Sequence, residues 1–376
     1  MEPKQDQKPQ ARCATARSWV ELFATEAGGA GAGEVRFRVL RKHGEPLLVL
    51  PTNNHCAAQA MALYPAQTAV ARVVRSLVRA MFAAGVPPVC EDCRVTLAPG
   101  QPFPRFLREL AGSDSLPPLA ILNGNPRQVS RRFVLLVFSP GAKPPVVVKA
   151  GIGQPASELI RKEVTFLKSL LPRLSGIPVV RGEFASGEVC AFATDFVPGD
   201  CPRETGPSRV AELLRAWLDR SRTLAVGELP QWQRLQRACA NDPLFIRLER
   251  KLAGERVHPT TSHGDLAPWN IKLAKSSAWV VLDWERGELN GLPAWDWFHF
   301  VIQPELLVRR RTPARIAADL RTFLTSPAFR AYAEAARISG LEQALLAAYL
   351  AYSAHVIRPS EGLQATEELL KLIAEP

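Results

Sequence analysis

The sequence has no hydrophobic run long enough to cross a membrane. Its longest nearly uncharged apolar stretch, Gln343–Ile357, has 15 residues, whereas a bilayer-spanning helix needs about 20. We expect this stretch to form a buried helix instead. The first 18 residues carry scattered charges and no apolar centre, a pattern unlike that of a secretory signal peptide. We therefore expect a soluble, cytoplasmic protein.

Repeats and patterned cysteines are also lacking. No segment recurs at a fixed period, which argues against solenoids and propellers. The seven cysteines are odd in number and scattered, which indicates reduced thiols and not a disulfide framework. One CxxC pair, Cys90 and Cys93, has His55 and Cys56 upstream and is a candidate zinc site. We favour buried or incidental thiols, because a structural zinc site usually shows a second clean pair.

Positive charge is in excess and unevenly distributed. The net charge is +11, and residues 121–182 alone hold ten lysines and arginines against two acids. Such a balance fits an anionic partner, whether nucleic acid, an anionic surface or an anionic substrate. The sequence contains no paired Cys/His zinc finger and no RNP aromatics. The charge therefore leaves the kind of anionic partner open, with nucleic acid the less favoured one.

The N-terminal third divides into a tail and a small module. Residues 1–17 are polar and without periodicity, and we expect them to be disordered. Residues 18–115 predict a small α+β module: the runs 35–39 and 47–50 flank a turn at Gly44, and apolar residues recur at helical spacing over 70–82. The sequence does not indicate what this module does.

The rest of the chain predicts a sheet-rich part followed by a helical part. Over residues 116–198 we expect three strands (119–122, 133–138 and 146–149), a helix, and two more strands. Over residues 199–376 the pattern is mainly helical, interrupted by one strand pair around 270–283. The predicted fold class is therefore α+β.

The segment from His263 to Asp283 holds the residue types that phosphoryl transfer requires. Asp265 and Asn270 lie five residues apart on a loop with Gly264, and Asp283 ends an apolar run. If the two neighbouring strands pair, these side chains face one place. Carboxylate and amide oxygens suit Mg²⁺, and a carboxylate free of the metal can accept a proton from a hydroxyl. Positioning and charge neutralisation are what this chemistry needs.

These motifs resemble those of the aminoglycoside phosphotransferase and choline kinase-like family. His263-Gly264-Asp265 with Asn270 is similar to its catalytic loop, and Asp283-Trp284-Glu285 to its metal-binding loop. The block from Gly291 to Asp296 resembles the family's Gly-x-Pro-x-x-Asp block. The resemblance covers about residues 118–300 by motif and does not extend to 1–115. It implies a bilobal protein-kinase-like fold, with a small sheet-rich N-lobe and a mainly helical C-lobe, preceded by the α+β module.

The resemblance also implies a nucleotide site further upstream. Lys149 would hold the phosphates of ATP, with GTP as the alternative donor, and Glu163 would pair with that lysine, Glu158 being the weaker candidate. Gly124 lies in the phosphate-covering turn, which departs from the protein-kinase pattern in having a single glycine. Thr194 and Phe196 fall in the segment that would offer backbone groups to adenine.

The remaining roles follow from the same resemblance. Asp265 would orient the acceptor hydroxyl and take its proton, and Asn270 and Asp283 would hold Mg²⁺. The other residues singled out are His263, as a structural histidine bonded to backbone; Asp296, as support of the loop; and Glu285 and Trp269, as candidate acceptor contacts with packing or capping as the alternative.

The acceptor is expected to be neutral or anionic. A polycationic acceptor needs an acidic cleft, because unpaired like charges repel, and residues 284–376 show no acidic surplus. The sequence therefore favours phosphorylation of a small hydroxyl compound such as a sugar. The alternative is a catalytically silent kinase-fold binding or scaffold protein recruited through residues 18–115. Lys149, Asp265, Asn270 and Asp283 are all present, which favours the enzyme.

Overall fold

The computed structural model divides the chain into two compact units. The first comprises residues 1–161 and 180–196, and the second residues 162–179 and 197–376, so that the boundary falls within one helix, α4 (Gln154–Leu170). The structure describes residues 19–23, 33–42, 44–64, 66–97, 100–124, 131–141, 143–170, 174, 176–202, 206–274, 278–359 and 362–374. The predicted disordered tail, 1–17, lies outside them.

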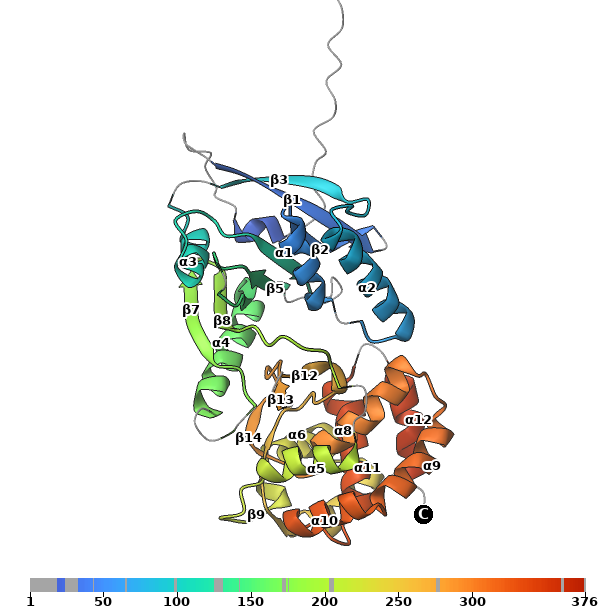
Figure 1. Cartoon of the computed structure of the whole chain (residues 1–376). Helices are drawn as coiled ribbons and strands as arrows, with labels where there is room; N and C mark the ends of the chain where they lie inside the picture. The colour runs from blue at the N-terminus through green and yellow to red at the C-terminus, as the bar shows by residue number, and fades with distance from the viewer. Residues whose placement is uncertain are drawn as a thin grey trace, which may run out of the picture. The chain divides into compact units, whose positions relative to one another are not determined.

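One eight-stranded antiparallel sheet organises the first unit (Figure 1). Its strand order is β3-β1-β2-β4-β5-β6-β8-β7. The predicted strands and the helix of 116–198 are present. The elements of this unit are η1 (Trp19–Leu22), β1 (Gly33–Lys42), β2 (Glu45–Pro51), α1 (Asn54–Ala60), η2 (Met61–Leu63), α2 (Ala69–Ala83), β3 (Glu91–Leu97), α3 (Pro102–Ala111), β4 (Leu119–Asn123), β5 (Arg131–Val137), β6 (Val146–Ile152), the start of α4, β7 (Val180–Ser186) and β8 (Val189–Asp195).

The strands of residues 18–115 belong to the same sheet as those of residues 116–198. β1 and β2 form the predicted hairpin around Gly44, and β2 then pairs with β4, aligning Leu48 with Leu122 and Val49 with Ile121. The sequence suggested a separate module because no motif spans the two segments. That residues 18–115 act as a unit of their own stays a prediction, but their strands are continuous with the sheet.

Side chains alternate between the two faces of the sheet along each strand, and each face packs into a buried core. On β4, Leu119 and Ile121 enter one core together with Trp19 and the α3 side chain Phe103. Ala120, between them, enters the other core, under α1 and Phe82 of α2. The sheet is therefore the middle layer of the unit.

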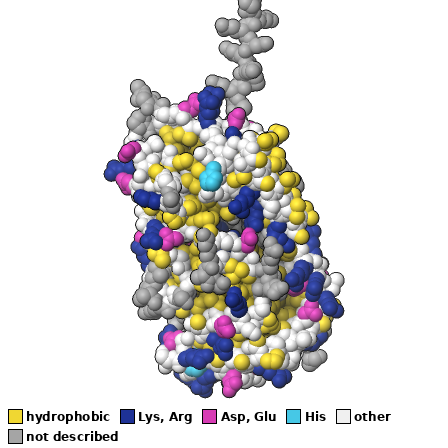
Figure 2. Space-filling view, in the orientation of Figure 1, with side chains coloured by type: hydrophobic (Ala, Val, Ile, Leu, Met, Phe, Trp, Pro, Cys, Tyr) yellow, Lys and Arg dark blue, Asp and Glu magenta, His cyan; other side chains and the backbone are white. Residues whose placement is uncertain are grey.

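Helix α2 covers the second core with only part of its surface. Phe82 is fully buried, whereas Val70, Val73 and Leu77 are each more than 60% exposed. Figure 2 shows apolar side chains gathered along the edge where Figure 1 draws α2. The helical period of 70–82 therefore predicted the helix correctly but did not identify its buried side.

The second unit is mainly helical, with three short strand pairs (Figure 1). The predicted fold class, α+β with a sheet-rich part followed by a mainly helical part, is thus confirmed. The elements are α5 (Pro207–Ala216), β9 (Leu224–Ala225), η3 (Val226–Glu228), α6 (Pro230–Cys239), α7 (Pro243–Leu252), β10 (Arg256–Val257), β11 (Thr260–Ser262), η4 (Pro268–Asn270), β12 (Ile271–Leu273), β13 (Trp279–Val281), β14 (Glu288–Gly291), α8 (Trp295–Gln303), η5 (Pro304–Val308), α9 (Pro313–Leu324), α10 (Pro327–Ala336), α11 (Glu342–Tyr352), η6 (Ser353–Ile357) and α12 (Leu363–Ala374).

The uncharged stretch 343–357 forms a buried helix, as expected. Every residue from Ala344 to Tyr352 in α11 is buried, and the turn η6 continues it to Ile357. Among the helices that the structure describes, none combines the length and apolarity that a membrane span needs. The low polarity of this segment is therefore explained by packing inside the second unit.

Candidate active site

Two short strand pairs hold the motif loops of the second unit. β12 pairs with β13, aligning Ile271 with Val281, and the amide of Leu282 donates to the carbonyl of Asn270 at 2.7 Å. The predicted strand pair around 270–283 is thus confirmed. The pairing brings the end of the loop that carries Asp265 next to the segment that carries Asp283. β11, which leads into the first loop, pairs with β14.

His263 joins the two loops through its ring. Its Nδ1 accepts from the amide of Asp265 at 3.2 Å, so Nε2 carries the proton and donates to the carbonyl of Leu282 at 2.8 Å. The ring also packs against Trp284, with centroids 4.8 Å apart. Burial lowers the pKa of His263 and keeps it neutral, although Asp296 opposes this effect. The side chain contacts backbone at both nitrogens.

Asp296, at the start of α8, holds the loop that carries Asp265 through hydrogen bonds to the loop backbone. Its Oδ2 accepts from the amide of His263 at 2.7 Å, and its Oδ1 accepts from the amide of Gly264 at 2.8 Å. Gly264 has φ +75°, and a Cβ there would lie 2.8 Å from the carbonyl oxygen of Arg286. The turn at position 264 therefore requires glycine. Both carboxylate oxygens of Asp296 accept hydrogen bonds from backbone amides, so these two amides are satisfied.

Asp265 is partly exposed, and its carboxylate has polar neighbours. The Oδ1 atom lies 3.0 Å from Nε2 of His299 and 3.9 Å from Nη1 of Arg286. Burial opposes ionisation of Asp265, but the contacts with His299 and Arg286 outweigh it and hold the pKa of the carboxyl below its ordinary value. Asn270 donates through Nδ2 to the carbonyl of Asp265 at 2.9 Å. Because its pKa is lowered, the Asp265 carboxyl is an anion at neutral pH.

Asp283 follows β13 in a backbone conformation that few residues adopt. Its φ is +68°, in the left-handed region, which costs a non-glycine residue energy and recurs at functional sites. The next residue, Trp284, donates its amide to Oε1 of Glu163 at 3.0 Å. Glu163 is buried, with 3% of its surface exposed, whereas Glu158 is exposed and bonded to Gln154. The buried glutamate of α4 is thus Glu163.

The first unit carries the other predicted residues. Lys149 is half-buried on β6, opposite Val134 and Phe192, and Thr194 is buried on β8. Phe196 packs against the second core. Gly124 follows β4, and its amide donates to the carbonyl of Arg132 at 3.0 Å. The rest of the predicted phosphate turn, residues 125–127, lies outside the described part of the chain. The expected pairing of Lys149 with Glu163 stays a prediction.

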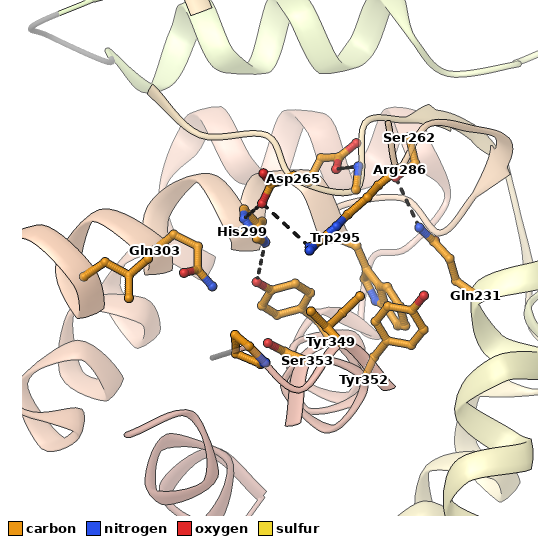
Figure 3. Close-up of a pocket in the computed structure, with 15 residues that line it drawn as sticks. Gln231, Ser262, Asp265, Arg286, Trp295, His299, Gln303, Tyr349, Tyr352 and Ser353 are labelled. Atoms are coloured by element: carbon orange, nitrogen blue, oxygen red, sulfur yellow. Dashed lines mark hydrogen bonds and ion pairs between the residues drawn. The ribbon is translucent and has the colours of Figure 1, made fainter. Parts of the chain in front are cut away.

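A cavity of about 150 Å³ opens beside Asp265 within the second unit (Figure 3). Trp269 and Glu285, the predicted acceptor contacts, are not among the residues that line it. Most of its lining was not anticipated from the sequence, because it comes from α6, α8, α11 and η6. Its lining includes the side chains of Gln231, Asp265, Arg286, Trp295, Asp296, His299, Gln303, Tyr349, Tyr352 and Ser353.

The candidate zinc ligands belong to the first unit. Cys93 is buried in the first core of the sheet, whereas Cys56 and Cys90 pack beside the second core. The described residues contain no group of three or more His, Cys, Asp or Glu side chains placed to hold a metal. The two thiols of the CxxC pair therefore lie on different faces of the sheet. Cys93, on β3, is buried in the first core, whereas Cys90 packs beside the second core.

Comparison with known proteins returns structural similarity only. No family model and no curated protein matches the chain. Among solved structures, an aminoglycoside phosphotransferase of Streptomyces rimosus is 14% identical, with 62% of this chain and 92% of that chain covered and a TM-score of 0.40. Aminoglycoside phosphotransferase APH(4)-Ia, bound to ADP and hygromycin B, is 13% identical over 72% and 97%, with a TM-score of 0.44.

A choline kinase of Cryptosporidium parvum is also similar. It is 10% identical, with 68% of this chain and 88% of that chain covered and a TM-score of 0.39. These solved structures are aminoglycoside phosphotransferases and a choline kinase, the classes of protein that the motifs resemble.

Proposed function

We propose that this chain is a small-molecule kinase that transfers the γ-phosphate of ATP to a hydroxyl group of a small acceptor. One observation carries the proposal: an ionised, partly exposed Asp265 lines a cavity, on a loop bonded to the segment of Asp283. Such a carboxylate can orient a hydroxyl and accept its proton. His263 and Asp296 hold the loop in place, and GTP is the alternative donor.

The donor side rests on the predicted nucleotide residues. Lys149 would contact the phosphates, Glu163 would hold that lysine, and Gly124 would allow the backbone to approach the phosphates. The backbone of Thr194–Phe196 would receive the base. Two observations support this assignment: Lys149 lies on a central strand of the sheet, and Glu163 is the buried glutamate of α4.

The donor set fits Mg²⁺ bound together with nucleotide phosphates. Asn270 uses its Nδ2 on the carbonyl of Asp265, which turns the amide oxygen away from that contact. Asp283 adds a carboxylate from a strained backbone position. Magnesium is usually held by one or two protein oxygens and by phosphates. Asn270 and Asp283 would hold the ion, which neutralises phosphate charge when bound.

The cavity favours a neutral or anionic acceptor. Its acidic side chains are Asp265 and Asp296, and both oxygens of Asp296 already accept from backbone amides. Arg286 adds a positive charge, and Trp295, Tyr349 and Tyr352 add aromatic surface. A cationic amine would therefore find Asp265 as its one open carboxylate among the described lining residues, whereas a sugar would meet rings and amide groups.

Thermal unfolding with Mg²⁺ and either ATP or GTP tests the donor site. A nucleotide at 100 times its dissociation constant should add about 2.7 kcal/mol to the stability of the wild type. Asp283→Ala should lose the magnesium-dependent part of this shift. Asp319→Ala, which removes an exposed carboxylate of α9, is the matched control and should keep it.

An acceptor screen then tests the transfer. We expect phosphorylation of neutral or anionic hydroxyl compounds by the wild type and none by Asp265→Ala. Turnover restricted to cationic amines would contradict the acceptor class. The absence of any nucleotide-dependent shift would contradict the whole proposal and favour a silent binding protein recruited through residues 18–115.

A further inference from the structure

Asp265 is contacted by a histidine that the proposed mechanism has not used. His299 lies on α8, with only 12% of its side chain exposed, and its Nε2 is 3.0 Å from Oδ1 of Asp265. On the opposite side of the ring, Nδ1 is 3.0 Å from the hydroxyl of Tyr349 on α11. Figure 3 shows the ring between the carboxylate and the phenol. The three side chains therefore form a continuous chain of polar contacts.

The two neighbours of the His299 ring suggest where the protons in this chain lie. Because Asp265 is ionised, the ring nitrogen that faces it must carry a hydrogen. Burial raises the pKa of Tyr349, so its hydroxyl remains protonated and can donate to Nδ1. In that arrangement Tyr349 would favour the ring form with its hydrogen on Nε2, facing Asp265, in the manner of a third group orienting an acid–base pair.

We propose that His299 is a positioning residue for phosphoryl transfer, which fixes the carboxylate of Asp265 through Oδ1 under the control of Tyr349. This inference rests on the proposed function. The other nearby donors lie farther from the Asp265 side chain: Nδ2 of Asn270 is 3.4 Å from Oδ2, and Arg286 is 3.9 Å from Oδ1. His299 therefore makes the shortest of these three contacts with the carboxylate.

The position of His299 makes this contact relevant to the reaction and not only to folding. His299 and Tyr349 both line the cavity that would receive the acceptor. With Oδ1 held by His299, the second carboxylate oxygen can serve the acceptor hydroxyl. Small misplacements of a reacting group reduce rates by about 100-fold. The orientation of Asp265 should therefore limit kcat.

Two substitutions of His299 separate a positioning role from a structural one. The amide of His299→Gln can reach the place of Nε2 and donate to Asp265, whereas that of His299→Asn is shorter and cannot. With an acceptor from the screen, we expect His299→Asn to lower kcat by about 100-fold and to change nucleotide affinity less than twofold. His299→Gln should recover at least tenfold of that loss. Equal kcat for both variants would overturn the inference.

Tyr349→Phe removes the hydroxyl that fixes the tautomer, and should lower kcat less than His299→Asn does. Tyr332→Phe is the matched control, because it removes the hydroxyl of another buried tyrosine. That hydroxyl accepts from the amide of Ala294 and does not contact His299. It should leave kcat near the wild-type value. If the two tyrosine variants lose kcat equally, the loss reflects packing and the role of Tyr349 is refuted.

Nitrogen-15 NMR of the histidine rings reads the contact without any acceptor. The sequence has six histidines, so the His299 signals can be assigned by their loss in His299→Gln. We expect the hydrogen on Nε2 in the wild type and a changed Nδ1 signal in Tyr349→Phe. A hydrogen on Nδ1 alone would overturn the inference, even in an active enzyme. A wild type without transferase activity but with the expected tautomer would instead count against the proposed function.

Discussion

Replacement of Asp296 by asparagine should destabilise the second unit strongly. Asp296 is 4% exposed, and its two oxygens accept from the amides of His263 and Gly264. An asparagine offers one oxygen and one NH₂ group, so that one of these amides would face a donor. A hydrogen bond to a charged group contributes about 1.5–3 kcal/mol, and an unsatisfied buried donor costs about 1–3 kcal/mol. Removal of a buried charge offsets part of this loss.

We therefore expect Asp296→Asn to lower the free energy of unfolding by about 2–4 kcal/mol. Urea denaturation followed by tryptophan fluorescence measures it, because seven of the eight tryptophans lie between residues 217 and 297, in the second unit. With a slope of about 1–3 kcal/mol per molar urea, the midpoint should fall by about 0.7–4 M.

A matched substitution shows whether the two amide bonds are responsible. Asp319→Asn changes an exposed carboxylate of α9 that pairs with Arg311, and surface ion pairs contribute at most about 1 kcal/mol. Its midpoint should remain close to that of the wild type. If Asp296→Asn and Asp319→Asn unfold at the same urea concentration, the bracing role assigned to Asp296 is refuted.

Two further predictions concern the same unit. Burial lowers the pKa of His263, whereas an unfolded histidine titrates near pH 6.5. The unfolded state therefore binds more protons below that pH, and the free energy of unfolding should fall on acidification by up to about 1.4 kcal/mol per pH unit. Urea titrations at about pH 5–7 should show a flatter profile for His263→Gln. Gly199→Ala should lower the free energy of unfolding by more than about 2 kcal/mol, because φ is +147° and a Cβ would lie 2.0 Å from the carbonyl oxygen of Leu273. Gly254→Ala, where a Cβ would stand in open space, should not lower it by this amount. Equal melting temperatures for the two variants would contradict this prediction.

The strands and helices could be predicted from the sequence where local patterns determine them. The alternation and turns of residues 116–198 identify β4 to β8, because a strand with buried faces needs apolar residues bounded by turn formers. The pairing of β2 with β4 was not predicted, because register depends on which edges meet and no local signal encodes it. The exposure of Val73 and Leu77 on α2 could not be inferred either. Helical spacing places apolar residues on one side of a helix but does not show what packs against that side.

The candidate site was predictable in its loops and not in its cavity. Asp265 and Asp283 were found because each lies in a short motif, and the pairing of β12 with β13 follows from apolar runs beside them. His299 and Tyr349 lie 34 and 84 residues beyond Asp265, and they meet it only through the packing of α8 and α11. A histidine in the mainly apolar segment Trp295–Gln303 was the one available signal, and it does not reveal a partner.

The junction of β2 and β4 changes how the N-terminal third should be regarded. Without residues 19–111, β4 would present an unpaired edge with the apolar side chains Leu119 and Ile121, the kind of surface on which chains associate. Trp19 and Phe37 would also leave the core that they share with those residues. The segment that none of these motifs covers thus contributes to the same sheet as Lys149. It covers an edge of that sheet, and we expect a chain without it to associate through that edge.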